Sequence, residues 1–239
     1  ALYCTSAQNV TFQFLSFSYN FATNKGSGIF IQTAIKVSSF RIILRDNKAT
    51  GPGGGMYLTD CTIIMNFLCT MAHNTALSGA GWYIENFDFV NNAVCHLVMN
   101  KAIELGAAMY ISSGKYSIDS NSVYISNTAQ LAGGACYFYN IQLSTFSKSL
   151  WRSNIAKSTG GAMLMGVRVM NLLLCKLMYN KAREGGALFL LNTKKFSCYS
   201  NSFIKNKAVS MGLSGGGALG MRDIEEVNLT KTAFLNNNA

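Results

Sequence analysis

An asparagine that returns every 26 or 27 residues constrains this chain more than any other feature. Each copy has a bulky apolar residue three places earlier, as in Tyr124 and Asn127. Only the last interval, from Asn206 to Asn237, is longer, at 31 residues. The nine copies are Asn20, Asn47, Asn74, Asn100, Asn127, Asn154, Asn180, Asn206 and Asn237. A period of this length predicts a solenoid, in which each turn packs on its neighbours.

A second anchor, a glycine-rich corner that closes on a small residue, identifies the rigid part of the repeat. Gly133-Gly134-Ala135 is a clear example. From the small residue to the next repeat asparagine the spacing is 19 residues in every copy except Ala162 to Asn180, where it is 18. A segment that tolerates so few insertions is typical of paired strands, because one extra residue would turn every later side chain to the opposite face.

The residues between the anchors favour strands over helices. Runs such as Met56-Tyr57-Leu58 are rich in β-formers, and glycine and asparagine separate them. We therefore expect an all-β fold, a right-handed parallel β-helix of about nine turns with three short strands each, as a single domain over residues 1–239. The asparagines should stack as a hydrogen-bonded ladder, each in the left-handed conformation at a corner, and glycine should supply positive φ at the other corner.

Two motifs carry a resemblance to a known family. Phe203-x-x-Asn206 and Gly185-Gly186-Ala187-Leu188 resemble the F-x-x-N and G-G-A-[ILV] repeats of chlamydial polymorphic outer-membrane proteins. They are also similar to the repeats of large, pectin-lyase-like surface proteins of protists. The resemblance covers the whole chain and implies a β-helix with an adhesive or structural role at a cell surface.

Self-association is the first partner that we expect. Both ends consist of ordinary repeat without a capping segment, which predicts a segment of a longer solenoid or a protomer that stacks head to tail. An apolar stripe that includes Tyr3, Phe30 and Tyr57 should face outward and offer a lateral contact, unless long loops cover it. Such a tyrosine stripe could also stack sugar rings.

An acidic glycan is the second expected partner, because the net charge is +10. Lys181 and Lys207 share one position on neighbouring turns, and a solvated basic edge is the alternative interpretation. The four-residue gain between Asn206 and Ala218 adds a predicted contact loop. The candidate interaction residues are Lys181, Arg183, Lys205, Lys207 and Met211. Nucleic acid is not expected, since no recognised binding module is present.

Catalytic chemistry finds little support, and we predict no catalytic residue, metal site or cofactor. Asp60 and Asp88 are the best pair of acids, near one corner on adjacent turns, while Asp223 and its two neighbouring glutamates fall in the last turn. His73 and His96 lack companions at the spacing of metal ligands or nucleophiles. A polysaccharide lyase or hydrolase stays an alternative.

The cysteines, the glycosylation sequons and the hydropathy of the chain give three further indications. The seven cysteines form no C-x-x-C motif; Cys69 and Cys95 share an inward position where a disulfide between turns is conceivable. Asn9 and Asn228 lie in N-glycosylation sequons, which matter only for a secreted protein. No uncharged apolar run long enough for a transmembrane segment is present.

These features predict a non-enzymatic structural or adhesive element outside the cell or on its surface, as a protomer or segment of a fibre or filament. The alternative within the same class is a glycan-binding adhesin.

Overall fold

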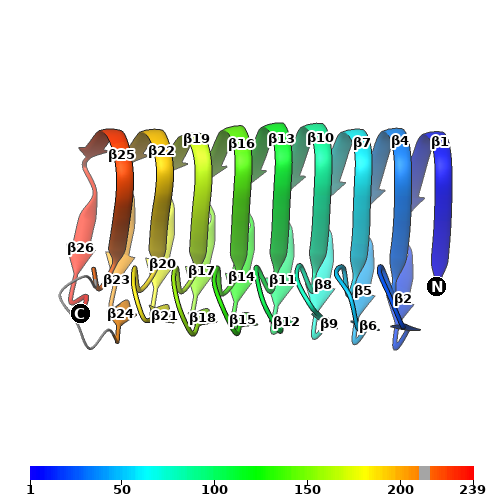
Figure 1. Cartoon of the computed structure of the whole chain (residues 1–239), viewed down its shortest axis with the longest axis horizontal. Coiled ribbons are helices and arrows are strands. Elements are labelled where there is room, and N and C mark those ends of the chain that lie inside the picture. Colours follow the sequence, from blue (N-terminus) through cyan, green and yellow to red (C-terminus); the bar gives the residue numbers. More distant parts are fainter. Residues whose placement is uncertain (210–215) are drawn as a thin grey trace.

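The chain forms a parallel β-solenoid, in a computed structural model that describes residues 1–209 and 216–239. Successive turns lie side by side along one axis, with the N-terminus at one end and the C-terminus near the other (Figure 1). All strand pairs in the described part are parallel and join one turn to the next. This pairing confirms the expected all-β solenoid class, and the right hand of the coil stays a prediction.

The strands of the first sheet, here called the long sheet, are longer than the short strands expected from the sequence. Each of its strands has 12 residues, except β19 with 11 residues, in the part of the chain that the structure describes. The nine strands are β1 (Leu2–Gln13), β4 (Ile29–Phe40), β7 (Met56–Phe67), β10 (Trp82–Ala93), β13 (Met109–Ser120), β16 (Cys136–Ser147), β19 (Met163–Leu173), β22 (Leu188–Tyr199) and β25 (Leu219–Thr230).

The other two sheets, here called the middle and short sheets, are narrow. Within the described residues, the middle sheet has strands of three residues: β2 (Ser16–Ser18), β5 (Ile43–Arg45), β8 (Thr70–Ala72), β11 (His96–Val98), β14 (Val123–Ile125), β17 (Leu150–Arg152), β20 (Lys176–Met178), β23 (Ser202–Ile204) and β26 (Ala233–Leu235). The described strands of the short sheet have two residues each: β3 (Phe21–Ala22), β6 (Lys48–Ala49), β9 (Thr75–Ala76), β12 (Lys101–Ala102), β15 (Thr128–Ala129), β18 (Ile155–Ala156), β21 (Lys181–Ala182) and β24 (Lys207–Ala208).

The repeat asparagines form the predicted ladder between the middle and short sheets. The side-chain amide of Asn47 donates to Oδ1 of Asn74 at 3.1 Å and to the carbonyl oxygen of Phe17, on the preceding turn, at 2.8 Å. The main-chain N–H of Asn47 donates to the same Oδ1 at 3.0 Å. This pattern continues to the pair Asn206 and Asn237, so each buried amide is satisfied by both neighbouring turns.

The conformation predicted for these asparagines was wrong. Positive φ belongs to the residue just before each of them, for example His73 at 57° and Lys205 at 50°. Because the preceding residue turns the corner, the asparagine is free to point its amide inward along the axis. The glycine corner agrees with the prediction: Gly133 has a φ of 61°, and a Cβ on Gly134 would collide with the carbonyl oxygen of Gly161 on the next turn.

The bulky residue three places before each asparagine lies in the core, as predicted. Leu97, Tyr124, Trp151 and their equivalents in the inner turns are fully buried and stack from turn to turn. Cys69 and Cys95 also lie side by side in an inward column, but all seven cysteines, each within the described residues, are free thiols.

The predicted outward stripe is a column of stacked rings on the long sheet. Ring centroids from Tyr3 through Phe30, Tyr57, Tyr83 and Tyr110 to Tyr137 are 4.5 to 5.3 Å apart. The glycine corners cover part of this column, since Tyr57 is buried and its hydroxyl accepts a hydrogen bond from Lys25 at 3.1 Å. The stripe is thus neither bare nor fully covered, and a lateral contact through it stays a prediction.

One carboxyl group lies inside the core. Asp119 is 1% exposed and accepts hydrogen bonds from the hydroxyls of Tyr124 at 2.6 Å and Ser149 at 2.9 Å. Burial raises the pKa of Asp119 from its ordinary value of 3.8 to about 6, although both hydroxyls favour the charged form. The ionised carboxylate therefore costs folding free energy at neutral pH.

Replacing an inner asparagine of the ladder should weaken the coil strongly. Asn127→Ala removes bonds to Leu97 and Asn154 and leaves Asn100 without its acceptor, so we expect a loss of about 3 kcal/mol in the free energy of unfolding. Asn20→Ala, at the outer end of the ladder, is the matched control and should cost about 1 kcal/mol, because the Asn20 side chain bonds only to Asn47 among the described residues. Denaturant unfolding measures both, and equal losses would contradict a cooperative ladder.

Asp119 should make stability fall as pH rises. The folded pKa lies above the unfolded one, so the contribution of the neutral acid is complete below about pH 4 and is lost as pH rises to about 6. The stability of Asp119→Asn relative to the original chain should therefore increase by about 3 kcal/mol between pH 4 and pH 7. Thermal unfolding of both proteins at the two pH values measures this difference, and a constant difference would show that the group keeps its ordinary pKa.

Candidate functional site

A bend in the middle of each long strand except β19 places polar side chains on the outer surface. The bend residue has positive φ, as in Asn140 at 55°, Asn192 at 49° and Asp223 at 56°. Asparagine and aspartate tolerate this conformation better than most residues. The bends therefore form an outward column of short polar side chains along the long sheet.

The strand β19 lacks this bend residue. Tyr139 of β16 pairs with Gly166 of β19, and Ile141 pairs with Val167, so Asn140 has no counterpart on the next turn. This deletion accounts for the shorter spacing of 18 residues between Ala162 and Asn180 in the sequence. In addition, the outward position next to the gap is Gly166, which has no side chain.

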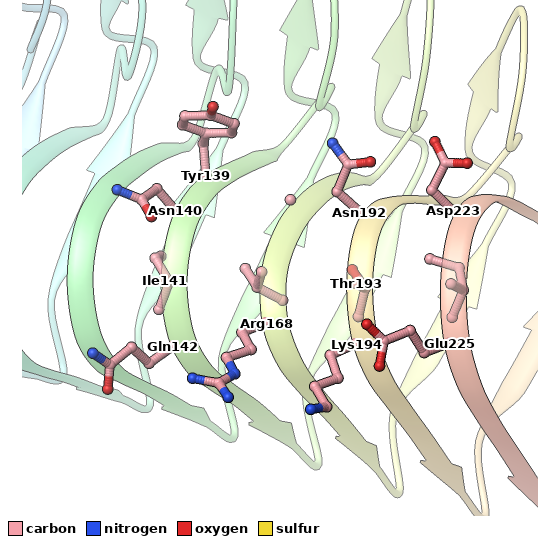
Figure 2. A pocket seen from close by; sticks show the side chains of 13 residues that line it. Tyr139, Asn140, Ile141, Gln142, Arg168, Asn192, Thr193, Lys194, Asp223 and Glu225 are labelled. Carbon is pink, nitrogen blue, oxygen red and sulfur yellow. The ribbon is translucent and has the colours of Figure 1, made fainter.

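A hollow of about 810 Å³ lies at this deletion on the outer face of the long sheet and is here called the turn-7 hollow. Figure 2 shows the side chains that surround it, from Tyr139 at one end to Asp223 and Glu225 at the other. The bend amides Asn140 and Asn192 lie on either side of the missing residue.

The floor of the turn-7 hollow is basic. Arg168 and Lys194 occupy the same outward position on adjacent turns, and Figure 2 shows both side chains extending to the same side. Both are exposed, and neither forms an ion pair or hydrogen bond with any described residue. Glu225 occupies the position next to Lys194 on the following turn without forming an ion pair with it. Two neighbouring cations in a concave site attract anions.

A second hollow of about 560 Å³ lies nearer the N-terminus of the long sheet and contains both acids of the predicted pair. Here the polar groups satisfy one another. Asn86 donates to Asp60 at 2.9 Å, and Lys115 pairs with Asp88 at 2.9 Å. The two carboxylates share a hollow, as their spacing suggested, but each is bound to a different neighbour.

The predicted basic corner also assembles, on the short sheet. Lys181 pairs in register with Lys207, and Lys205 lies over the ring of Tyr179 at 5.8 Å. All three lysines and Arg183 are exposed. Met211, the remaining predicted interaction residue, lies outside the described residues.

The remaining candidates lie apart from the turn-7 hollow. Asn9 and Asn228 are exposed on the first and last long strands, and Asn228 donates to Glu226 at 2.8 Å. His73 and His96 are exposed on the surface. Across residues 1–209 and 216–239, no group of three or more His, Cys, Asp or Glu side chains could hold a metal ion.

The described part also contains no helix with the length and apolar character needed to span a membrane.

Reasoning from the sequence missed the turn-7 hollow, although a signal was present. It assigned function to the insertion after Asn206 and to the basic corner. The shortened spacing from Ala162 to Asn180 marked the deletion, and Gly166 within it marked an absent side chain. A deletion in the rigid segment of a repeat is therefore as informative as an insertion in its loop.

Comparison with models of known protein families, with curated proteins and with solved structures found no match to this chain.

Proposed function

We propose that this chain is a protomer or segment of a structural and adhesive rod outside the cell, in which a further turn, from the same polypeptide or from a second copy, packs on each of its end faces. The observation that carries this proposal is the change in exposure of equivalent residues along the coil. Phe203 and Phe234 occupy the same inward position on neighbouring turns, yet Phe203 is buried and Phe234 is 42% exposed. The last turn therefore presents its core residues to solvent.

The first turn has the same property. Leu2, Val10 and Phe17 have core positions there but are only half-buried, because a neighbouring turn covers them on one side only. Tyr3, Tyr19 and Phe21 are outward residues of the same turn and are between 60% and 80% exposed. Exposed apolar side chains at a sheet edge favour association, and the open edges of β1 and β25 offer backbone groups for continued pairing. A further turn, from the same polypeptide or from a second copy, would bury both.

The adhesive and extracellular parts of the proposal rest on the outer surface. Both sequon asparagines are exposed and hence sterically open to glycosylation. The basic corner and the turn-7 hollow provide positive charge for an acidic glycan, in keeping with the net charge of +10.

The alternative of a polysaccharide lyase or hydrolase has less support. A general acid or base must be within reach of the proton that it transfers. Asp60 and Asp88 are instead engaged by Asn86 and Lys115, respectively.

A charge on the end face should weaken self-association. We expect the average molecular mass in solution to rise with protein concentration as chains associate. Phe21→Lys should raise the dissociation constant of this association about tenfold, since it replaces a 60% exposed ring on the first turn with a charge. The repeat accepts lysine at this position, because Lys48 and Lys101 occupy it on other turns. Light scattering coupled to size-exclusion chromatography measures the mass.

Ile155→Lys is the matched control for that experiment. Ile155 is exposed at the same position in the middle of the rod and pairs with Lys181, so the variant adds the same charge away from the ends. We expect it to associate like the original chain. Equal weakening by the two variants, or a chain that stays monomeric at all concentrations, would refute association through the end faces.

A further inference from the structure

We propose that the turn-7 hollow binds an acidic saccharide, with the acidic group on Arg168 and Lys194 and the sugar ring against Tyr139. This inference rests on the adhesive part of the proposed function and supplies it with a site and a ligand class. It differs from the sequence-based expectation, which placed the glycan at the basic corner of the short sheet.

The charge of the ligand follows from the two cations. Their Cα atoms are on adjacent turns, roughly 4.8 Å apart, so the positive charges repel each other unless an anion lies between them. Some other cations on this sheet have partners: Lys115 pairs with Asp88 at 2.9 Å, and Lys195 pairs with Glu226 at 2.9 Å, whereas Lys36 of β4 has none among the described residues. Arg168 and Lys194 lack such partners among the described residues. A carboxylate or sulfate would satisfy both of them.

A sugar ring accounts for the rest of the lining. Tyr139 is 54% exposed, and its ring lies beside Gly166, where a Cβ would come within 3.1 Å of Tyr139 Cδ2. An exposed aromatic ring beside a gap can stack on the apolar face of a sugar. The amides of Asn140, Gln142 and Asn192 lie around it without hydrogen bonds to described residues, and the fixed bends position two of them in advance.

The acidic end of the hollow argues against a simple inorganic anion. Asp223 and Glu225 are exposed at that end and would repel negative charge. Sugar hydroxyls, in contrast, can donate hydrogen bonds to these carboxylates while accepting them from the amides. A ligand with one acidic group and several hydroxyls satisfies both ends of the hollow.

The test compares equal charge changes inside and outside the hollow. Isothermal titration calorimetry would use a hyaluronan tetrasaccharide, a chondroitin sulfate tetrasaccharide and a sialylated trisaccharide, with neutral chitotetraose and inorganic sulfate as controls. Arg168→Gln and Lys194→Gln should each weaken binding of the acidic saccharides about tenfold. Lys115→Gln is the matched control, since Lys115, Gln142, Arg168 and Lys194 share one position of the repeat and the net charge changes equally.

Two further variants separate the parts of the site. Tyr139→Ser, which puts the hydroxyl of the equivalent Ser112 in place of the ring, should weaken saccharide binding about fivefold. Inserting one asparagine between Gly166 and Val167 restores the 12-residue strand and should abolish binding without loss of thermal stability, because it fills the gap between Asn140 and Asn192.

Three results would overturn the inference. They are binding of none of the acidic saccharides, an equal loss in Lys115→Gln, and sulfate or chitotetraose binding as tightly as the acidic saccharides. Self-association through the end faces is measured separately with Phe21→Lys, so failure of saccharide binding would leave the association of the rod intact.

Discussion

The hydrogen bonds between turns are the constraint on which this structure depends. Every turn donates to and accepts from its neighbours, and the asparagine ladder repeats this exchange with side chains that are fully buried in the inner turns. A buried amide without partners would cost free energy, so each asparagine requires the next one at the same place. The ladder continues even across the 31-residue interval from Asn206 to Asn237, so the position of each asparagine in the coil is fixed more strictly than its spacing along the chain.

The same constraint explains why a single deletion has a local effect. The strand β19 is one residue shorter than its neighbours, and the register shifts only at the bend, between Tyr139 and Ile141. On both sides of the bend the pairing continues, so the core columns stay aligned. The missing residue is lost from the outer surface, where it leaves a hollow between Asn140 and Asn192. The rigid pairing of the turns thus converts a change of one residue into a concave, polar surface.

Polar groups in the interior show that stacking does not require a uniformly apolar core. Asp119 lies in one column with Asn92 and Phe146 and accepts hydrogen bonds from Tyr124 of its own turn and Ser149 of the next one. Its pKa is raised because burial penalises the charged form more than these two bonds favour it. In the last turn, by contrast, apolar residues at core positions are exposed: Phe234 and Leu229 have no further turn in the described chain to cover them.

The sequence by itself determined the repeat, the parallel stacking, the asparagine ladder and the inward position of residues such as Trp151. It could do so because a period of fixed length leaves one register in which all apolar and amide side chains meet their equivalents. It also brought Lys181 next to Lys207 and Asp60 near Asp88. Only the tertiary structure decided which charged side chains form ion pairs or hydrogen bonds with a neighbour. Asp88 is paired by Lys115 and Asp60 is bound by Asn86, whereas Arg168 and Lys194 form no ion pair with any described residue. Those outcomes depend on the directions of side chains on neighbouring turns, and the spacing of residues along the sequence does not give these directions. The shortened strand was visible in the sequence, but its consequence, an open hollow and not a shifted register, required the coil in three dimensions.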